Sequence, residues 1–254
     1  MKPGVATKRS VYSGSLILVN RELPCRETPP PHFLTAVNGD SGVLLERRAA
    51  ALLNMLMQEI GGWTEIIPVS GWRSQEEQQG IWDESMEENG ADFTEKYVAL
   101  PGHSEHQTGL AIDLGLRREE LDFIRPSFPY SGICETFRQK AARYGFIERY
   151  PAGKEAITGI AQEPWHFRYV GMPHAEIMAK MGLTLEEYHS FVKQFPYGKK
   201  PLIYRKGSRH IEVSYLSAEL SRYAEVEDGL SVPCTLSGNN SDGYVVTAWL
   251  DRKV

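Results

Sequence analysis

The segment from Gly109 to Leu116 alternates large apolar residues with small or acidic ones, and this pattern constrains the fold more than any other stretch. Side chains of a β-strand point alternately to opposite faces. Ala111 and Asp113 therefore fall on the face opposite four large apolar residues: Leu110, Ile112, Leu114 and Leu116. An unpaired buried charge is very costly, so Asp113 must be paired, bound to a cation, or solvated on an exposed strand face.

Two histidines precede this strand in the chain. His106 lies seven residues before Asp113, and Gly109 between them permits a sharp bend. His106 is therefore expected on a loop that leads into the strand. His103 belongs to the same loop and offers the same imidazole, and the spacing does not choose between the two.

A third histidine, His166, follows Glu163 and Pro164 and stands among aromatic residues. It is either a packed core histidine or a ligand. In a continuous strand, residues 163 and 166 would face opposite sides. Pro164 disfavours regular pairing and predicts a turn or bulge, which would let both side chains converge. Two His and one Asp can hold zinc with a coordination position open for water, and Glu163 would be close enough to take a proton from that water.

Ser74 and Glu77 form a predicted capping box, so a helix is expected to begin beside Arg73 and to carry Gln78 on its first full turn. A fixed guanidinium near a zinc site can stabilise an oxyanion or grip a carboxylate. The alternative for Arg73 is a surface residue at a helix start. Glu105 is interpreted as a solvated loop carboxylate in preference to an acceptor for a ligating histidine.

The composition excludes several classes of protein. A net charge of −5 over 254 residues argues against nucleic-acid binding, which normally requires a basic patch. No apolar run approaches the roughly 20 residues of a transmembrane helix, and no signal-peptide core follows the charged N-terminus. Cys25, Cys134 and Cys234 are widely spaced and are expected to be reduced thiols. We therefore expect a cytoplasmic protein without a membrane partner, and the sequence leaves a homodimer open.

The pattern along the chain predicts an α+β fold class with two domains. A catalytic domain is expected over residues 1–199 and a small β-rich C-terminal appendix over 200–254. Apolar spacing and turn residues predict strands at 15–20, 66–71, 109–116 and 165–170, and helices at 42–60, 74–89, 134–144 and 174–193, the last broken at Gly182. Thr184 and Glu187 form a second predicted capping box after this break, and residues 237–243 are expected to form a turn between strands of the appendix.

These motifs together resemble the D-Ala-D-Ala carboxypeptidase family of the VanY and VanXY type, which is associated with vancomycin resistance. Its signature SxHxxGxAxD is filled by Ser104, His106, Gly109, Ala111 and Asp113. Its second element, ExxH, is filled by Glu163 and His166. The stretch 70–74 with Gln78 resembles the family's SGYRSxxxQ element, with Trp72 in place of Tyr. The resemblance covers roughly residues 12–195.

The resemblance implies a compact zinc D,D-peptidase (Hedgehog-like) fold with a central antiparallel sheet flanked by helices. It implies Zn²⁺ bound by His106, Asp113 and His166, which favours His106 over His103. It further implies Glu163 as general base and Arg73 as the residue that polarises the scissile carbonyl. Gln78 and Ser104 would help to bind the substrate, through its terminal carboxylate.

The implied substrates are small peptides, namely D-Ala-D-Ala and the D-Ala-D-Ala end of peptidoglycan precursors, with the soluble bifunctional VanXY type as the best match. A peptidoglycan endopeptidase that cleaves an L-Ala-D-Glu bond could share the ligand set. A non-catalytic zinc-binding module is the other alternative. Glu163 and Arg73 favour catalysis, since a binding module needs neither.

Overall fold

The computed structural model describes residues 10–39, 41–118, 122–222 and 233–250, and the chain forms two compact units. The α+β unit spans Val19–Tyr188. The β-rich unit joins the described residues up to Leu18 to those from His189 onward. The predicted α+β class is confirmed. The division of function after residue 199 stays a prediction.

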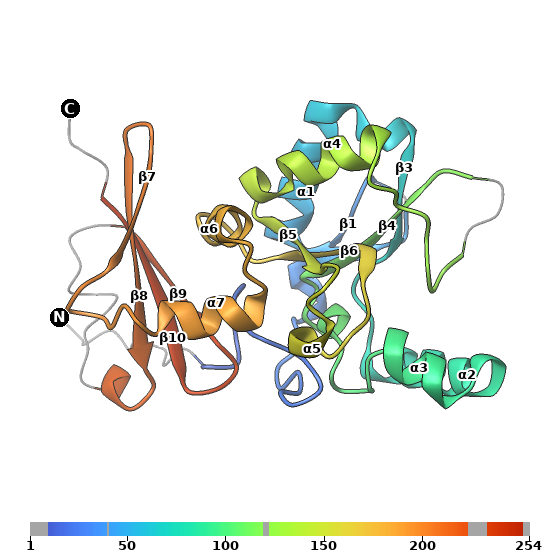
Figure 1. The fold of residues 1–254 in the computed structure, drawn as a ribbon, viewed down its shortest axis with the longest axis horizontal. Helices are drawn as coiled ribbons and strands as arrows, with labels where there is room; N and C mark the ends of the chain where they lie inside the picture. The colour runs from blue at the N-terminus through green and yellow to red at the C-terminus, as the bar shows by residue number, and fades with distance from the viewer. Residues whose placement is uncertain (1–9, 40, 119–121, 223–232, 251–254) are drawn as a thin grey trace. The chain divides into compact units, whose positions relative to one another are not determined.

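A four-stranded antiparallel sheet forms the centre of the α+β unit (Figure 1). Its strands are β3 (Ile66–Ser70), β4 (Ala111–Leu116), β6 (Glu163–Tyr169) and β5 (Phe146–Tyr150), in that order across the sheet. The strands predicted at 66–71, 109–116 and 165–170 are confirmed. The edge strand β5 was not predicted.

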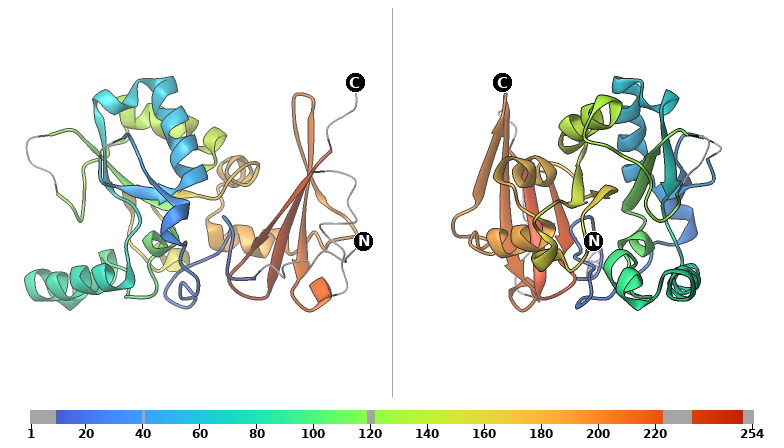
Figure 2. Two further views of the ribbon diagram at one scale, coloured as in Figure 1. Left: turned by 180° about the vertical axis from the view of Figure 1, so that it is seen from behind. Right: turned by 45° about the vertical axis from the view of Figure 1, so that its right-hand side comes forward.

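Helices α1 (Arg47–Ile60) and α4 (Gly132–Ala141) cover one face of this sheet (Figures 1 and 2). The Glu46 carboxylate caps α1 by accepting hydrogen bonds from the first backbone N–H groups. Apolar side chains of both helices meet the apolar face of β4 and β6 in one core, which includes Leu53, Leu56, Ile112, Leu114, Phe137 and Phe167. Burial of each such side chain stabilises the fold by about 1.5–3 kcal/mol. Packing against the two helices therefore fixes which face of the sheet is turned toward the core.

Helix α1 begins later than the predicted start near residue 42 because the preceding residues form a small antiparallel pair. In this pair, β1 (Leu34–Ala36) lies against β2 (Leu44–Glu46). The other helices are α2 (Gln75–Asn89), α3 (Ala91–Tyr97), α5 (Glu155–Thr158), α6 (His174–Met181) and α7 (Leu185–Val192). Short 3₁₀ turns occur at Pro31–Phe33, Gly62–Thr64, Glu105–Thr108, Ala142–Tyr144 and Leu220–Arg222.

Both predicted capping boxes are confirmed. Ser74 Oγ accepts from the backbone of Glu77, whose carboxylate accepts in return from the backbone of Ser74. Thr184 and Glu187 exchange the same two bonds at the start of α7. Gly182 ends α6 in a left-handed conformation, as the predicted break requires.

The strand predicted at 15–20 is wrong. Leu16, Ile17 and Leu18 are buried, but their segment is irregular. Its backbone bonds go largely to side chains: Leu16 N–H donates to Ser237 Oγ, and Leu18 O accepts from Asn240 Nδ2. The apolar residues of this segment thus correctly indicated that it is buried, but the expectation that it pairs as a β-strand was wrong.

The β-rich unit contains a second four-stranded antiparallel sheet, ordered β7 (Leu202–Lys206), β8 (Arg209–Ser217), β10 (Gly243–Trp249) and β9 (Cys234–Gly238). The turn before β10 is held by Asn239 Oδ1, which accepts from three successive backbone N–H groups. This agrees with the strands and turn predicted after residue 200.

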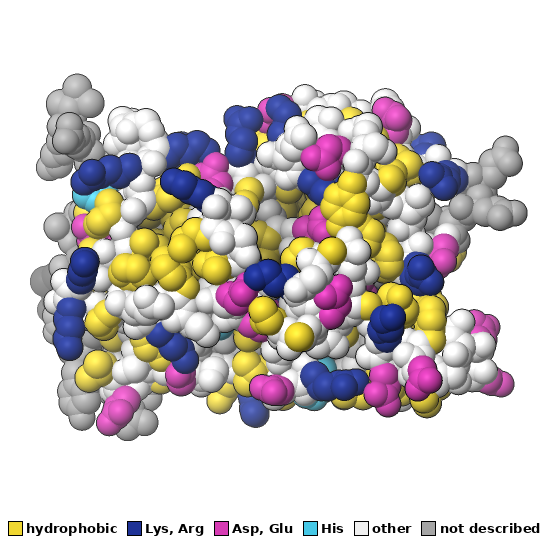
Figure 3. All heavy atoms as spheres, viewed as in Figure 1, with side chains coloured by type: hydrophobic (Ala, Val, Ile, Leu, Met, Phe, Trp, Pro, Cys, Tyr) yellow, Lys and Arg dark blue, Asp and Glu magenta, His cyan; other side chains and the backbone are white. Residues whose placement is uncertain are grey.

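On the face shown in Figure 3, Lys and Arg side chains lie interspersed with Asp and Glu. Within the described ranges, no helix combines the length and apolar character needed to cross a membrane.

Candidate metal centre and active site

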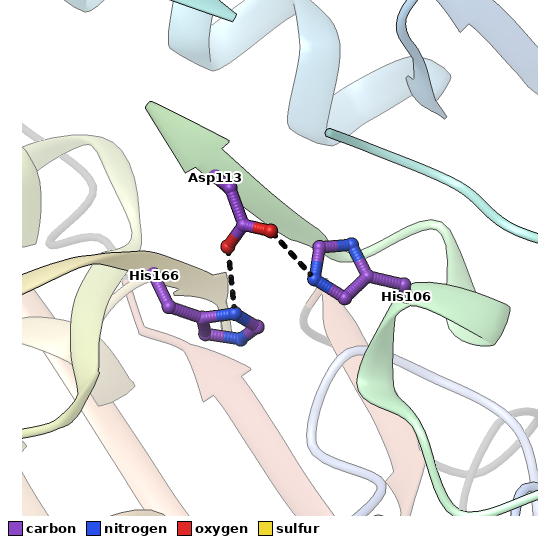
Figure 4. A group of neighbouring side chains, drawn as sticks. All are labelled: His106, Asp113 and His166. Carbon is purple, nitrogen blue, oxygen red and sulfur yellow. Dashed lines mark hydrogen bonds and ion pairs between the residues drawn. The ribbon is translucent and has the colours of Figure 1, made fainter. Parts of the chain in front are cut away.

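Asp113 on β4 and His166 on β6 are direct partners in the central sheet. Partners on adjacent strands point to the same face. The adjacent residues Ile112 and Phe167 point the other way and are fully buried in the core. The core therefore fixes the carboxylate and the imidazole on the opposite face, where His166 Nδ1 lies 2.9 Å from Asp113 Oδ1 (Figure 4).

His106 reaches the same carboxylate from the 3₁₀ turn before β4. Its Nε2 lies 3.1 Å from Asp113 Oδ2 (Figure 4). Its Nδ1 lies 2.7 Å from the carbonyl oxygen of Gly71. A carbonyl only accepts hydrogen bonds, so Nδ1 carries the proton and Nε2 offers a lone pair. Gly109 ends the turn with φ 69°, the left-handed conformation that the predicted sharp bend needs.

Gly71 occupies a position where no larger residue fits. An added Cβ would lie 2.3 Å from the backbone oxygen of Leu44. The adjacent residue Trp72 donates its N–H to the same oxygen at 2.6 Å, which fixes the peptide that accepts from His106. This contact explains the glycine of the 70–74 motif, whose function was not evident from spacing.

One ligand atom from each of His106, Asp113 and His166 lies within 4.8 Å of the others, and all three residues are buried. Among the described residues, this is the one group of three or more His, Cys, Asp or Glu side chains arranged to hold a metal ion. His103 lies apart from it, with Nδ1 2.8 Å from the carbonyl oxygen of Asn20.

Glu163 enters the site through the predicted irregularity of β6. Phe167 pairs with Glu148 on β5, and Glu163 pairs with Tyr150, so β6 advances four residues while β5 advances two. This bulge lets Glu163 point to the same side as His166, with Oε2 3.7 Å from Nδ1. Burial raises the pKa of the Glu163 carboxyl to about 8, although His166 opposes the shift.

Arg73 lies at the entrance to α2 and is tied to the metal-binding loop, because its backbone N–H donates to the carbonyl of His106 at 3.3 Å. Its Nη2 lies 3.9 Å from Asp113 Oδ2. Gln78 on α2 is almost fully buried, with Nε2 donating to the carbonyl of Ala99 at 2.8 Å. The side chain of Arg73 therefore lies beside the cluster, and that of Gln78 is buried instead of lying on the surface.

A cavity of about 280 Å³ opens over the cluster. All seven residues predicted for the site line it: Arg73, Gln78, Ser104, His106, Asp113, Glu163 and His166. Tyr150, which was not predicted, also lines the cavity, and its ring centroid lies 4.9 Å from that of His166.

The interpretation of Glu105 as a solvated carboxylate is wrong. Its side chain is fully buried, and Oε1 accepts from Arg149 Nε at 2.8 Å and Arg168 Nη1 at 2.7 Å. Burial raises the pKa of such a carboxyl, but the two arginines hold the pKa of Glu105 well below its usual range. Spacing gave no sign of this contact, because Arg149 and Arg168 lie 44 and 63 residues from Glu105 in the chain.

Comparison with known families decides the classification of this site. Residues 43–172 match the VanY family model, described as D-alanyl-D-alanine carboxypeptidase. That segment contains the whole metal cluster together with Arg73, Gln78, Ser104 and Glu163.

The chain belongs to the VanY family. It is 44% identical over 182 residues to VanXYC of Enterococcus gallinarum, a bifunctional D-Ala-D-Ala dipeptidase and D-Ala-D-Ala carboxypeptidase, covering 71% of this chain and 96% of that relative. The family resemblance predicted from the motifs is confirmed.

Two solved structures share the fold of this chain. The D,D-dipeptidase VanXYg, in complex with a D-Ala-D-Ala phosphinate analogue, is 45% identical with a TM-score of 0.86, covering 94% of this chain and 95% of its own. A VanY D,D-pentapeptidase variant from a VanB-type resistance cassette, in complex with Zn(II), is 34% identical with a TM-score of 0.55, covering 69% of this chain and 98% of its own. The predicted zinc D,D-peptidase fold is therefore confirmed.

Proposed function

We propose that this VanY-family chain is a zinc-dependent D,D-peptidase that hydrolyses D-Ala-D-Ala and removes the terminal D-Ala of peptidoglycan precursor peptides. The observation that carries the proposal is the convergence of a His-Asp-His cluster, a buried carboxylate and a guanidinium on one cavity. Loss of D-Ala-D-Ala ends would deprive vancomycin of its target. Such an enzyme would support resistance.

The donor set of the cluster fits zinc. Two imidazole nitrogens and one carboxylate oxygen are the ligand types of catalytic zinc sites, which keep a fourth position for water or substrate. His106 offers Nε2, because its Nδ1 is bound to Gly71, and His166 presents Nδ1 to the same carboxylate of Asp113. When bound, zinc acts as a Lewis acid and lowers the pKa of water from about 15.7 to about 7.

Glu163 is the proposed general base. Its carboxylate lies beside the ligand nitrogen of His166, so it is within reach of a water molecule held at the cluster. It would accept the proton of the attacking water and deliver it to the nitrogen of the departing D-amino acid. A positioned acid–base group contributes about 10²–10⁴ in rate.

Arg73 is the proposed electrophilic residue. Its guanidinium borders the cluster and the cavity, where it can donate to the oxyanion that forms as the scissile carbonyl is attacked. Ser104 and Gln78 are proposed to bind the terminal carboxylate of the substrate. Ser104 supplies a buried hydroxyl, and the amide of Gln78, fixed by its bond to Ala99, keeps a second N–H.

D-alanine release from D-Ala-D-Ala and from a soluble precursor pentapeptide, with and without a chelator, tests this function. Chelator-sensitive release from both substrates supports the bifunctional activity, and the ratio of rates gives its balance. Release from neither, by protein that contains stoichiometric zinc, would contradict it. An L-Ala-D-Glu peptide assayed in parallel would then separate the endopeptidase from the non-catalytic zinc-binding module.

We propose an accessory role for the β-strands after residue 199, because all seven proposed site residues lie in the α+β unit. A cytoplasmic location, a homodimer and the absence of nucleic-acid binding stay predictions. Cell fractionation, light scattering and a nucleic-acid shift assay test them in turn.

A further inference from the structure

The carboxylate of Glu105 is shared between the metal centre and a buried pair of arginines. Its Oε1 accepts from Arg149 and Arg168, as described above, and its Oε2 turns toward the imidazole of His166, 3.6 Å from Nε2. The side chains of Glu105 and both arginines are fully buried. A carboxylate held by two guanidinium donors in this way has little freedom to turn away from His166.

The two facing atoms, Glu105 Oε2 and His166 Nε2, are both buried without a hydrogen-bond partner. Buried polar atoms are normally hydrogen-bonded, so two unpartnered polar atoms that face each other are candidates to bond to one another. The separation is only slightly longer than a hydrogen bond. A hydrogen bond from Nε2–H to Oε2 would satisfy both atoms.

Glu105 is also fixed from the side remote from the metal cluster. The guanidinium of Arg149 donates two hydrogen bonds to the carboxylate of Glu186 at the start of α7. Nη1 lies 2.9 Å from Oε2, and Nη2 lies 2.6 Å from Oε1. Such bidentate pairs restrict geometry more than single contacts do. The chain of contacts thus runs from Glu186 through Arg149 to Glu105 and ends at His166.

We propose that Glu105 is a positioning residue for His166, which holds the proton on Nε2 and thereby leaves the Nδ1 lone pair for the metal. A neutral imidazole carries one N–H, so an acceptor at Nε2 selects the tautomer. Gly71 O does the equivalent for His106 through the opposite nitrogen. Outer acceptors of this kind orient metal-binding histidines and raise their basicity. The inference rests on the proposed metal site.

The most informative variant is Glu105→Gln, which has nearly the same shape. An amide offers one oxygen and one NH₂ group. Two guanidinium donors converge on the Oε1 position, so we expect the amide oxygen to face the arginines and the NH₂ group to face His166 Nε2–H, which then loses its acceptor. Glu105→Asp keeps the charge but withdraws the carboxylate from His166. The matched control is Glu186→Gln, which alters the remote side of Arg149 and does not touch His166.

Two readouts are measured on the full-length protein: the zinc dissociation constant by chelator competition, and the ¹H–¹⁵N signal of the His166 ring with labelled histidine. We expect zinc-loaded wild type to show an exchange-protected Nε2–H. Glu105→Gln should weaken zinc binding about 10–100-fold and abolish that protection. Glu105→Asp should fall between the two. Glu186→Gln should stay close to the wild type, because Arg149 Nε and Arg168 Nη1 still hold the Glu105 carboxylate directly.

A folded Glu105→Gln protein with wild-type zinc affinity and an unchanged Nε2–H signal would overturn the positioning role and leave the proposed function standing. Wild-type protein that binds no zinc would overturn both. If Glu105→Gln does not fold, the zinc affinity of Glu105→Asp and the His166 Nε2–H signal of the wild type test the positioning role instead. A zinc-loaded wild type without a protected Nε2–H signal also overturns the inference.

Discussion

Asp113 and His166 face each other across β4 and β6, and the remaining oxygen of Asp113 faces His106. One carboxylate therefore touches both imidazoles, 2.9 Å from one and 3.1 Å from the other. Strand register fixes the first contact and the turn at Gly109 fixes the second. Strand register and this turn thus bring the three side chains of the cluster together.

This arrangement predicts that zinc stabilises the folded protein through Asp113. Ligand binding to the native state adds about 2.7 kcal/mol when free zinc is at 100 times its dissociation constant. We expect the chelator-treated protein to melt at a lower temperature than the zinc-loaded protein, and Asp113→Asn to lose most of that difference. Thermal unfolding followed by circular dichroism measures it.

The matched control is Asp83→Asn, an exposed position on α2 that is remote in sequence from the cluster. It should retain the full zinc-dependent shift. An Asp113→Asn protein whose melting temperature responds to zinc like the wild type would show that the ion binds elsewhere.

Glu163 is predicted to serve catalysis without holding the metal. Glu163→Gln keeps the shape of the side chain but cannot take up a proton, so D-alanine release should fall by about 10²–10⁴-fold. Zinc content, measured by atomic emission on the same preparation, should stay stoichiometric. Glu155→Gln, at an exposed position on α5, serves as the control and should keep wild-type activity.

Loss of zinc together with activity in Glu163→Gln would instead make Glu163 a ligand. Activity close to that of the wild type would remove it from the mechanism altogether.

Gly71 is predicted to position its own carbonyl oxygen, which accepts a hydrogen bond from His106 Nδ1–H. A Cβ at residue 71 would lie 2.3 Å from a backbone oxygen, so Gly71→Ala must shift the loop whose carbonyl holds Nδ1. We expect weaker zinc binding and lower thermal stability. Gly80→Ala is the control: nothing lies within 4 Å of its added Cβ, and in the helix α2 it should stabilise by up to about 1 kcal/mol.

Equal zinc affinity in Gly71→Ala and Gly80→Ala would mean that the loop relaxes without moving the carbonyl. The glycine would then matter for packing alone.

The sequence was sufficient for the parts of the site that follow from strand periodicity and local motifs. Alternation placed Asp113 opposite the core face, and Pro164 signalled the bulge that turns Glu163 toward His166. The capping box located Arg73 at a helix start. Each of these inferences depends on residues close together in the chain.

Contacts between distant segments were not predictable in the same way. Glu105 appeared solvated because its partners, Arg149 and Arg168, are 44 and 63 residues away. The irregular segment at Leu16 was taken for a strand because Ser237, its hydrogen-bond partner, is 221 residues distant. Local pattern reports that a residue is buried, but the identity of its partner depends on the tertiary fold.

Asp242 in the β-rich unit gives a prediction that is independent of the metal site. Burial raises its pKa, but hydrogen bonds from Lys193 Nζ at 2.7 Å and Asn239 Nδ2 at 2.8 Å outweigh this and lower the pKa from 3.8 to about 2. Since the folded protein holds the proton less tightly than the unfolded chain, the carboxylate stabilises the fold above about pH 4. That contribution disappears as the pH falls toward 2.

Asp242→Asn should therefore be less stable than the wild type at pH 7, and the difference should shrink between pH 4 and pH 2. Both partners are substantially exposed, so we expect an effect below about 1 kcal/mol. Urea unfolding at a series of pH values measures it. Lys193→Gln should lower the free energy of unfolding by a similar amount. The double variant should lower it little further, because both changes break the same ion pair. A difference that is constant with pH would assign the effect to the shape of the turn and not to the charge of Asp242.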